Sequence, residues 1–71
     1  MLDEAINCYE KALELEDTDW EAHRDLGTCY MMRNDMEKAM KCFERAIEIN
    51  PEDALSFNNI GSALIAMNKM R

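Results

Sequence analysis

The sequence contains very few residues that interrupt helices. Two Gly and one Pro occur among 71 residues, whereas Ala, Leu, Glu, Lys and Met are frequent. Because Gly and Pro are the residues that most disfavour a helix interior, their scarcity favours helix along nearly the whole chain. A chain of this length forms one small domain that buries only about 60 % of the surface its unfolded form exposes, so a single compact core is marginal. The composition therefore predicts one small all-α domain.

The sequence also lacks a long apolar run and a basic start. No segment approaches the roughly 18 apolar residues that a membrane span requires, and Met-Leu-Asp-Glu at the start is unlike a signal peptide. The three cysteines, Cys8, Cys29 and Cys42, are odd in number and show no CxxC spacing. These absences predict a soluble chain with free thiols in a reducing, cytoplasmic setting.

Basic residues are scarce in the first third of the chain. Residues 1–25 carry 9 acids and 2 bases, while residues 26–71 carry 6 of each, and the net charge is -7. Nucleic acids and anionic membranes are bound by clustered Lys and Arg, so this balance argues against both as partners. A basic partner is one interpretation of the acidic first third, and solvated helix faces are the simpler one.

No residue pattern for catalysis is present. The sequence has no Gly-rich phosphate loop and no histidine paired with a nucleophile signal. His23 is the one histidine, and we expect it to be a packed core residue. Nothing near Cys8 or Cys42 points to thiol reactivity or metal binding. We predict that the chain is not an enzyme and that it has no cofactor and no metal site.

What the sequence does contain is a repeat with a period of 34 residues. The matched pairs are Tyr9 and Phe43, Ala12 and Ala46, and, in a second stretch, Leu26-Gly27 and Ile60-Gly61. Two separate stretches that share one period are typical of stacked repeat units.

Apolar residues within each stretch recur at three and four residues, which indicates amphipathic helices. The start signals are a possible capping box from Thr18 to Glu21, a turn with a cap at Asn34-Asp35, and Pro51 in a first helical turn. The predicted helices are roughly 3–16, 18–32, 36–49 and 52–67.

Small residues in the predicted helices indicate close packing. Gly27 and Gly61 each cost about 1 kcal/mol in a helix interior relative to Ala. We therefore expect a neighbouring helix to approach too closely for a Cβ at both positions. Tyr30 and Phe43 are large residues placed opposite small ones, which lets the layers interdigitate.

These residues carry a family resemblance. The series Leu26-Gly27-x2-Tyr30, Ala39-x3-Phe43, Ala46 and Pro51 resembles the 34-residue pattern of the tetratricopeptide repeat family. His23 departs from it, since the pattern prefers Trp there, although Phe57 fills the equivalent place in the next helix.

The resemblance implies an all-α fold in which antiparallel helix-turn-helix repeats stack as a short right-handed solenoid segment of four helices. On this register, residues 20–53 form one complete repeat. Residues 1–19 form the second helix of a preceding repeat, and residues 54–71 form the first helix of a following one.

The resemblance also implies a partner-binding concave face, lined by the first helix of each repeat, for a protein or peptide ligand. Carried over by register, the face comprises Glu21, Arg24, Asp25, Thr28, Met31, Met32, Leu55, Asn58, Asn59, Ser62, Ile65 and Ala66.

Several of these positions have two interpretations. The amide of Asn59 both donates and accepts, so it can hold a ligand's backbone, or it is a solvated Asn. Arg24 and Asn59 resemble two of the five positions of the family's carboxylate clamp, but Thr28 replaces a clamp Asn and the likeness is weak. Met31 and Met32 are adaptable contacts for a ligand or plain core filling. Trp20 is a partner anchor, or it packs under the preceding helix.

The last predicted helix carries a face without a partner. Its apolar residues are Phe57, Ile60, Leu64 and Met67. Burying such side chains is worth about 1.5 to 3 kcal/mol each, so a bare face is an unfavourable resting state. Neighbouring repeats of a longer array cover the face, or residues 1–16 of another copy do so.

The sequence therefore predicts an interaction scaffold that binds a peptide or helix of a partner along the concave face. The alternative is a structural self-assembly module that completes its repeats by head-to-tail or helix-exchanged packing with its own copies. We predict that the isolated chain self-associates.

Overall fold

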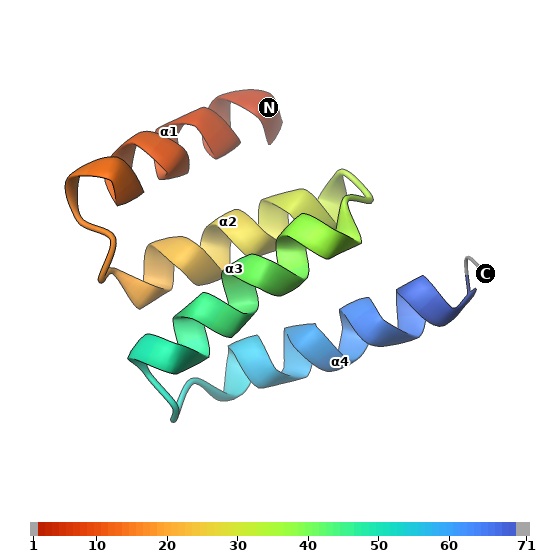
Figure 1. Cartoon of the computed structure of the whole chain (residues 1–71). Coiled ribbons are helices and arrows are strands. Elements are labelled where there is room, and N and C mark those ends of the chain that lie inside the picture. The colour runs from red at the N-terminus through yellow and green to blue at the C-terminus, as the bar shows by residue number, and fades with distance from the viewer. Residues whose placement is uncertain (1, 70–71) are drawn as a thin grey trace.

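Four helices joined by short turns make up the fold (Figure 1). The computed structural model describes residues 2–69. Its helices are α1 (Leu2–Leu15), α2 (Trp20–Met32), α3 (Met36–Ile49) and α4 (Ala54–Lys69), with no strand in this range. Each helix begins and ends within two residues of its predicted bounds, so the all-α prediction is confirmed.

The start of α2 differs from the prediction. The carboxylate of Asp19, not the hydroxyl of Thr18, caps the helix by accepting a hydrogen bond from the Ala22 backbone N–H at 3.3 Å. The Thr18 hydroxyl instead donates to Glu16 in the preceding loop. The expected capping box from Thr18 is therefore wrong. A carboxylate near a helix N-terminus has the additional advantage of interacting with the positive end of the helix dipole.

The turn between α2 and α3 is closed by backbone hydrogen bonds around Asn34. Asn34 has φ 67°, the left-handed conformation that Asn tolerates better than most residues. The Asn34 N–H donates to the Met31 carbonyl, and the Asp35 N–H donates to the Tyr30 carbonyl. These two bonds form a Schellman motif, which ends α2 and reverses the chain. Asp35 then precedes α3 without a side-chain cap bond.

The start of α4 also differs from the prediction. Asn50 anchors a turn, since its backbone carbonyl accepts from the Asp53 N–H and its side-chain oxygen accepts from the Glu52 N–H. Pro51 occupies the second position of this turn, a place that Pro favours, and α4 begins three residues later at Ala54. The expectation that Pro51 lies in the first helical turn is therefore wrong.

Each helix packs on its neighbours along the chain. The central pair is α2 with α3; α1 packs on α2, and α4 packs on α3, with a small contact to α2. Within residues 2–69, α1 and α4 do not contact each other and lie on opposite sides of the central pair (Figure 1). The fold is an open helical repeat solenoid rather than a closed bundle.

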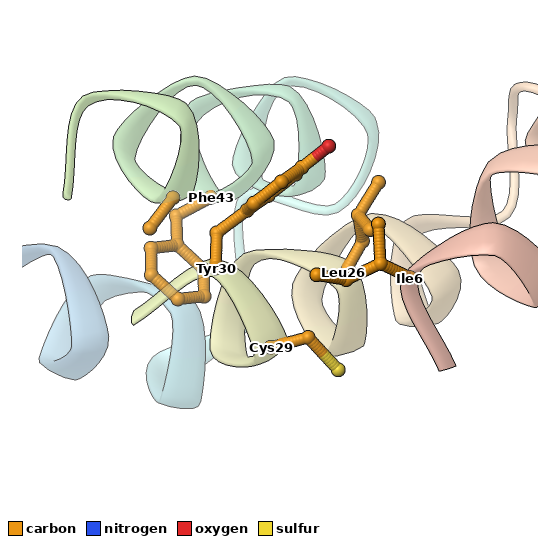
Figure 2. Packing of buried hydrophobic residues seen from close by; sticks show 6 residues of the cluster. Ile6, Leu26, Cys29, Tyr30 and Phe43 are labelled. Carbon is orange, nitrogen blue, oxygen red and sulfur yellow. The ribbon is translucent and has the colours of Figure 1, made fainter. Parts of the chain in front are cut away.

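The core lies where α2 meets α1 and α3. Ile6 and Leu26 form one end of the buried cluster and Phe43 the other, with Tyr30 between (Figure 2). Phe43 is fully buried, and so are the small residues Ala39 and Ala46 of the same helix. Large and small side chains thus alternate in the core, as the sequence predicted.

The two helical glycines have different surroundings. A Cβ placed on Gly27 would lie 2.7 Å from Cε1 of Phe43, so the predicted close approach is confirmed there. A Cβ placed on Gly61 would meet nothing within 4 Å among residues 2–69, so the same prediction is wrong for Gly61 in that part of the chain. The reason is that Phe43 covers Gly27, whereas among the described residues no helix covers the equivalent face of α4.

Candidate functional site

The predicted concave face belongs to α2 and α4, the two helices that flank α3 in Figure 1. Its exposed residues are Glu21, Thr28, Met32, Leu55, Asn58, Ser62 and Ile65. Its half-buried residues are Arg24, Asp25, Met31, Asn59 and Ala66. None of the set is buried, so every one of these side chains has some solvent-accessible surface.

Arg24 is the most constrained residue of the predicted face. Its guanidinium lies 3.6 Å from the carboxylate of Asp53 and 3.7 Å from that of Asp25. It also lies 5.3 Å from the ring centroid of Trp20, at the first residue of α2, in cation–π geometry. Two carboxylates and one ring therefore engage the Arg24 guanidinium, which leaves it poorly suited to clamp a ligand's carboxylate.

Asp53 is a buried acid that sequence reasoning missed. It is only 6 % exposed, and it accepts a hydrogen bond from the Ser56 hydroxyl at 2.5 Å while facing Arg24. A buried carboxylate needs such partners, because burying an unpaired charge is costly. Asp53 thereby links the start of α4 to α2. The 34-residue period pairs Asp53 with Asp19, the cap of α2, and that match was the available signal.

The two methionines of the predicted face have different environments. Met31 is half-buried and packs against the core cluster, which supports core filling for that residue. Met32 is 66 % exposed at the last residue of α2. On α4, Leu55 and Ile65 are exposed to a similar degree. The face therefore presents three apolar side chains to solvent.

A hydrogen bond ties α1 to α2 on the side of the core. The Tyr30 hydroxyl donates to Glu10 at 3.3 Å. Desolvation of the phenol and the nearby negative charge of Glu10 raise the pKa of Tyr30. The negative charge of Asp25, followed by desolvation, likewise raises the pKa of Tyr9. Both shifts favour the neutral form of the phenol.

All three cysteines are free thiols. Cys8 is exposed, Cys29 is buried and Cys42 is half-buried. Desolvation, with a smaller effect of Glu10, raises the pKa of the Cys42 thiol to about 11. Desolvation also raises the pKa of Cys29. Since the thiolate is the nucleophile, these shifts make both thiols less reactive than an ordinary exposed thiol.

His23 lies at the edge of the fold rather than in its core. It is half-buried, and its Nε2 donates to the Asp17 carbonyl at 2.8 Å, because a carbonyl oxygen only accepts. His23 therefore holds the loop between α1 and α2.

In the part of the chain that the structure describes, no group of three or more His, Cys, Asp or Glu residues is arranged to hold a metal ion.

The predicted self-association face is partly solvent-exposed. Phe57 is 52 % exposed and Leu64 is 50 % exposed, whereas Ile60 packs in part against the core cluster. Met67 is half-buried.

No helix between residues 2 and 69 is both long enough and apolar enough to cross a bilayer.

An open stack of antiparallel helices with small-against-large packing defines a helical repeat protein. Residues 20–53 match a family model described as tetratricopeptide repeat, and residues 1–19 match a second model with the same description. The chain belongs to the tetratricopeptide repeat family. Repeats of this family are non-catalytic modules that generally mediate protein–protein interaction. No curated protein matches the chain.

Proposed function

We propose that the chain is a protein interaction scaffold that holds a peptide or helix of a partner protein along the concave face of α2 and α4. The observation that carries the proposal is the exposure of Met32, Leu55 and Ile65 on the two helices that the register assigns to this face. Apolar side chains are costly to leave in water, and a partner's apolar residues cover them favourably.

The polar residues of this face complement a peptide backbone. Asn58 and Asn59 lie beside each other in sequence on α4, and each amide offers a donor and an acceptor. Such groups pair with a peptide unit whatever its side chains are. The helix α4 has no acid and one base, while Glu21 is the exposed charge on the face of α2. A neutral or basic apolar peptide fits this surface better than an acidic one.

The arrangement of repeats is part of the same proposal. Residues 20–53 act as a complete repeat, residues 1–19 supply the second helix of a preceding repeat, and residues 54–71 supply the first helix of a following one. The 34-residue period and the antiparallel α2–α3 pair support this division. We further propose a cytoplasmic, reducing location, which the three free thiols support.

Selection from a displayed library of random peptides tests the concave face. Enriched peptides are then titrated against wild type, Asn59→Ala, Leu55→Ser and the control Lys41→Ala, which changes an exposed residue of α3. We expect about tenfold weaker binding for Asn59→Ala and Leu55→Ser, as for residues that contact a ligand directly, and no change for the control. Equal binding to all four proteins would remove the site assignment. Arg24 is left intact because its ion pairs stabilise the fold.

A second candidate function is self-assembly through the ends of the stack. The exposed Phe57 and Leu64 on α4 favour it, because they lie on the face that has no partner helix within the described residues. This function is compatible with binding along the concave face, since different residues carry the two surfaces.

A further inference from the structure

The α2–α3 pair shows how the two types of helix in this chain fit together. The ring of Phe43 rests on the backbone at Gly27, so close that a Cβ there would lie 2.7 Å from Cε1. Ala39 and Ala46 on the same helix are fully buried. The fit thus consists of an aromatic ring and two small residues of α3 set against the glycine of α2.

The helix α4 carries the same receiving surface without an occupant. Gly61 is the 34-residue counterpart of Gly27, and no atom of the described residues lies within 4 Å of a Cβ built on it. Leu64 is 50 % exposed, whereas its counterpart Tyr30 is 8 % exposed. Phe57 is 52 % exposed and precedes Gly61 by four residues on the same helix, so the two lie on one face. The socket that Phe43 fills on α2 is therefore open on α4.

The helix α1 carries the surface that corresponds to the packed side of α3, and this surface is only partly covered. Tyr9 is the counterpart of Phe43, and it is half-buried rather than fully buried. Ala12 is exposed, whereas its counterpart Ala46 is 0 % exposed. One flank of α1 already packs on α2, where Tyr9 joins the core cluster. The remaining flank of α1 corresponds to the side of α3 that packs against Gly27 of α2.

The two helices differ in their balance of charged residues. The helix α1 has four acids and one base, and α4 has one base and no acid. The contact between these two helices therefore does not set carboxylates against carboxylates, in a chain whose net charge is -7.

We infer that this chain binds a second copy of itself head to tail, with α1 of one copy packed on α4 of the next and the Tyr9 ring seated over Gly61. The inference rests on the proposed self-assembly and adds to it the docking mode. A second copy is the occupant because one chain carries both surfaces, the open glycine surface of α4 and the aromatic surface of α1. They correspond to the two surfaces that α2 and α3 already bring together within the chain. The two helices are on opposite sides of the central pair, so α1 does not reach α4 of its own chain. The contact is heterologous, and it therefore propagates into a ring or an open filament, or closes where two chains exchange helices.

Two substitutions at exposed or open positions test the two halves of the contact without lowering the stability of the monomer. Ala12→Arg places a long charged side chain on the free flank of α1, and Gly61→Leu fills the open socket of α4. We expect each to weaken association about tenfold or more, as overpacking does in a close-fitting contact. Gly61→Leu should at the same time not lower the thermal midpoint of dilute protein, because Leu has the higher helix propensity.

Matched controls carry the same new side chains at neighbouring positions. Asn7→Arg changes α1 at a position whose counterpart, Lys41, is exposed in the α2–α3 pair, and Ser62→Leu changes α4 where the counterpart Thr28 is exposed. Sedimentation velocity over a wide concentration range should show wild-type assembly for both controls.

A mixing experiment tests the head-to-tail direction. Ala12→Arg leaves the α4 socket intact, and Gly61→Leu leaves the α1 surface intact, so each variant retains one working end. At a concentration where wild type assembles and the variants do not, we expect each variant alone to sediment as a monomer and an equimolar mixture to form a 1:1 heterodimer. A mixture that stays monomeric while wild type assembles would contradict the docking mode.

The other outcomes separate the two levels of the proposal. Wild type that remains monomeric at all concentrations overturns self-assembly itself. Wild-type assembly that neither substitution weakens leaves self-assembly standing and overturns the Tyr9–Gly61 contact. Loss of assembly in the controls as well would show a broader interface than the one inferred and would equally overturn the stated mode.

Discussion

At the scale of single residues, Gly27 and Gly61 share a place in the repeat but not an environment. Gly27 lies under a fully buried phenyl ring, whereas Gly61 faces open space. A methyl group added to the first must displace the fully buried ring of Phe43. The same group added to the second enters solvent and only restricts the unfolded chain.

This difference predicts opposite effects of one substitution. Gly27→Ala should lower the free energy of unfolding by about 1 kcal/mol, since overpacking costs about 1–3 kcal/mol and helix propensity recovers about 1 kcal/mol. Gly61→Ala should raise it by about 0.5–1 kcal/mol. Urea unfolding of dilute protein measures both. Equal effects in the same direction would show that Phe43 does not constrain Gly27.

Cys42 makes stability depend on pH in the alkaline range. Its pKa is raised from 9.0 to about 11 because burial disfavours the thiolate. The folded chain therefore holds a proton that the unfolded chain loses between these two values. By linkage, the stabilisation is fully present below pH about 9 and decreases as the pH rises toward about 11.

We predict that Cys42→Ala flattens this alkaline decline. The free energy of unfolding, followed by urea titration from neutral pH to pH about 11, should fall less steeply in the variant than in wild type. Cys8→Ala is the matched control, because that thiol is exposed on α1. A decline that is unchanged by Cys42→Ala would assign it to Tyr9, Tyr30 and Cys29, whose pKa values are also raised.

At the scale of helices, two aspartates in equivalent places hold the starts of α2 and α4. Asp19 accepts from the Ala22 N–H at an exposed position. Asp53 is buried, accepts from Ser56 and pairs with Arg24 of α2. The first is a local cap, while the second also connects two helices.

Asp53→Ala should therefore cost more stability than Asp19→Ala. Loss of the Asp19 cap should cost about 1 kcal/mol. Loss of Asp53 should cost about 3 kcal/mol, because it removes hydrogen bonding and leaves the partly buried Arg24 with one carboxylate fewer. Thermal unfolding with matched buffers gives the comparison. Equal costs would mean that the Arg24–Asp53 pair contributes nothing beyond capping.

The helices and their period were predictable from the sequence, because apolar spacing is local and recurs in register. The close approach at Gly27 was also predictable, whereas Phe43 as the residue that makes it was not. The cap at Asp19 was missed because Thr18 and Asp19 are adjacent candidates, and the sequence does not show which oxygen reaches Ala22. The Arg24–Asp53 pair joins residues from two different helices, so it depends on packing that no local pattern encodes. The concave face follows from register alone and remains a prediction.

At the scale of the whole molecule, the helices form a line of neighbours. The helices α2 and α3 each have partners on two sides, whereas α1 packs only on α2. In stacked repeats, stability is a sum of contributions from each unit and its nearest neighbours. The ends of the line are therefore held by fewer contacts than its centre.

Hydrogen exchange should reveal this gradient. Backbone amides of α2 and α3 should be the best protected, and those of α1 the least, because α1 separates from the stack without disturbing the α3–α4 contact. Mass spectrometry of exchanged peptides measures the order at concentrations where the chain is monomeric. Equal protection in all four helices would show that the chain opens only as one unit.

The seam between α3 and α4 has a practical consequence for engineering length. Inserting a second copy of residues 20–53 after Asp53 would pack α3 against a new α2 in the place that α4 now takes, an arrangement that the chain already uses between α1 and α2 and between α3 and α4. We expect its melting temperature to exceed that of the original, and a lower one would mean that the units are not interchangeable. The repeat unit of this chain is in this sense a module for lengthening the stack.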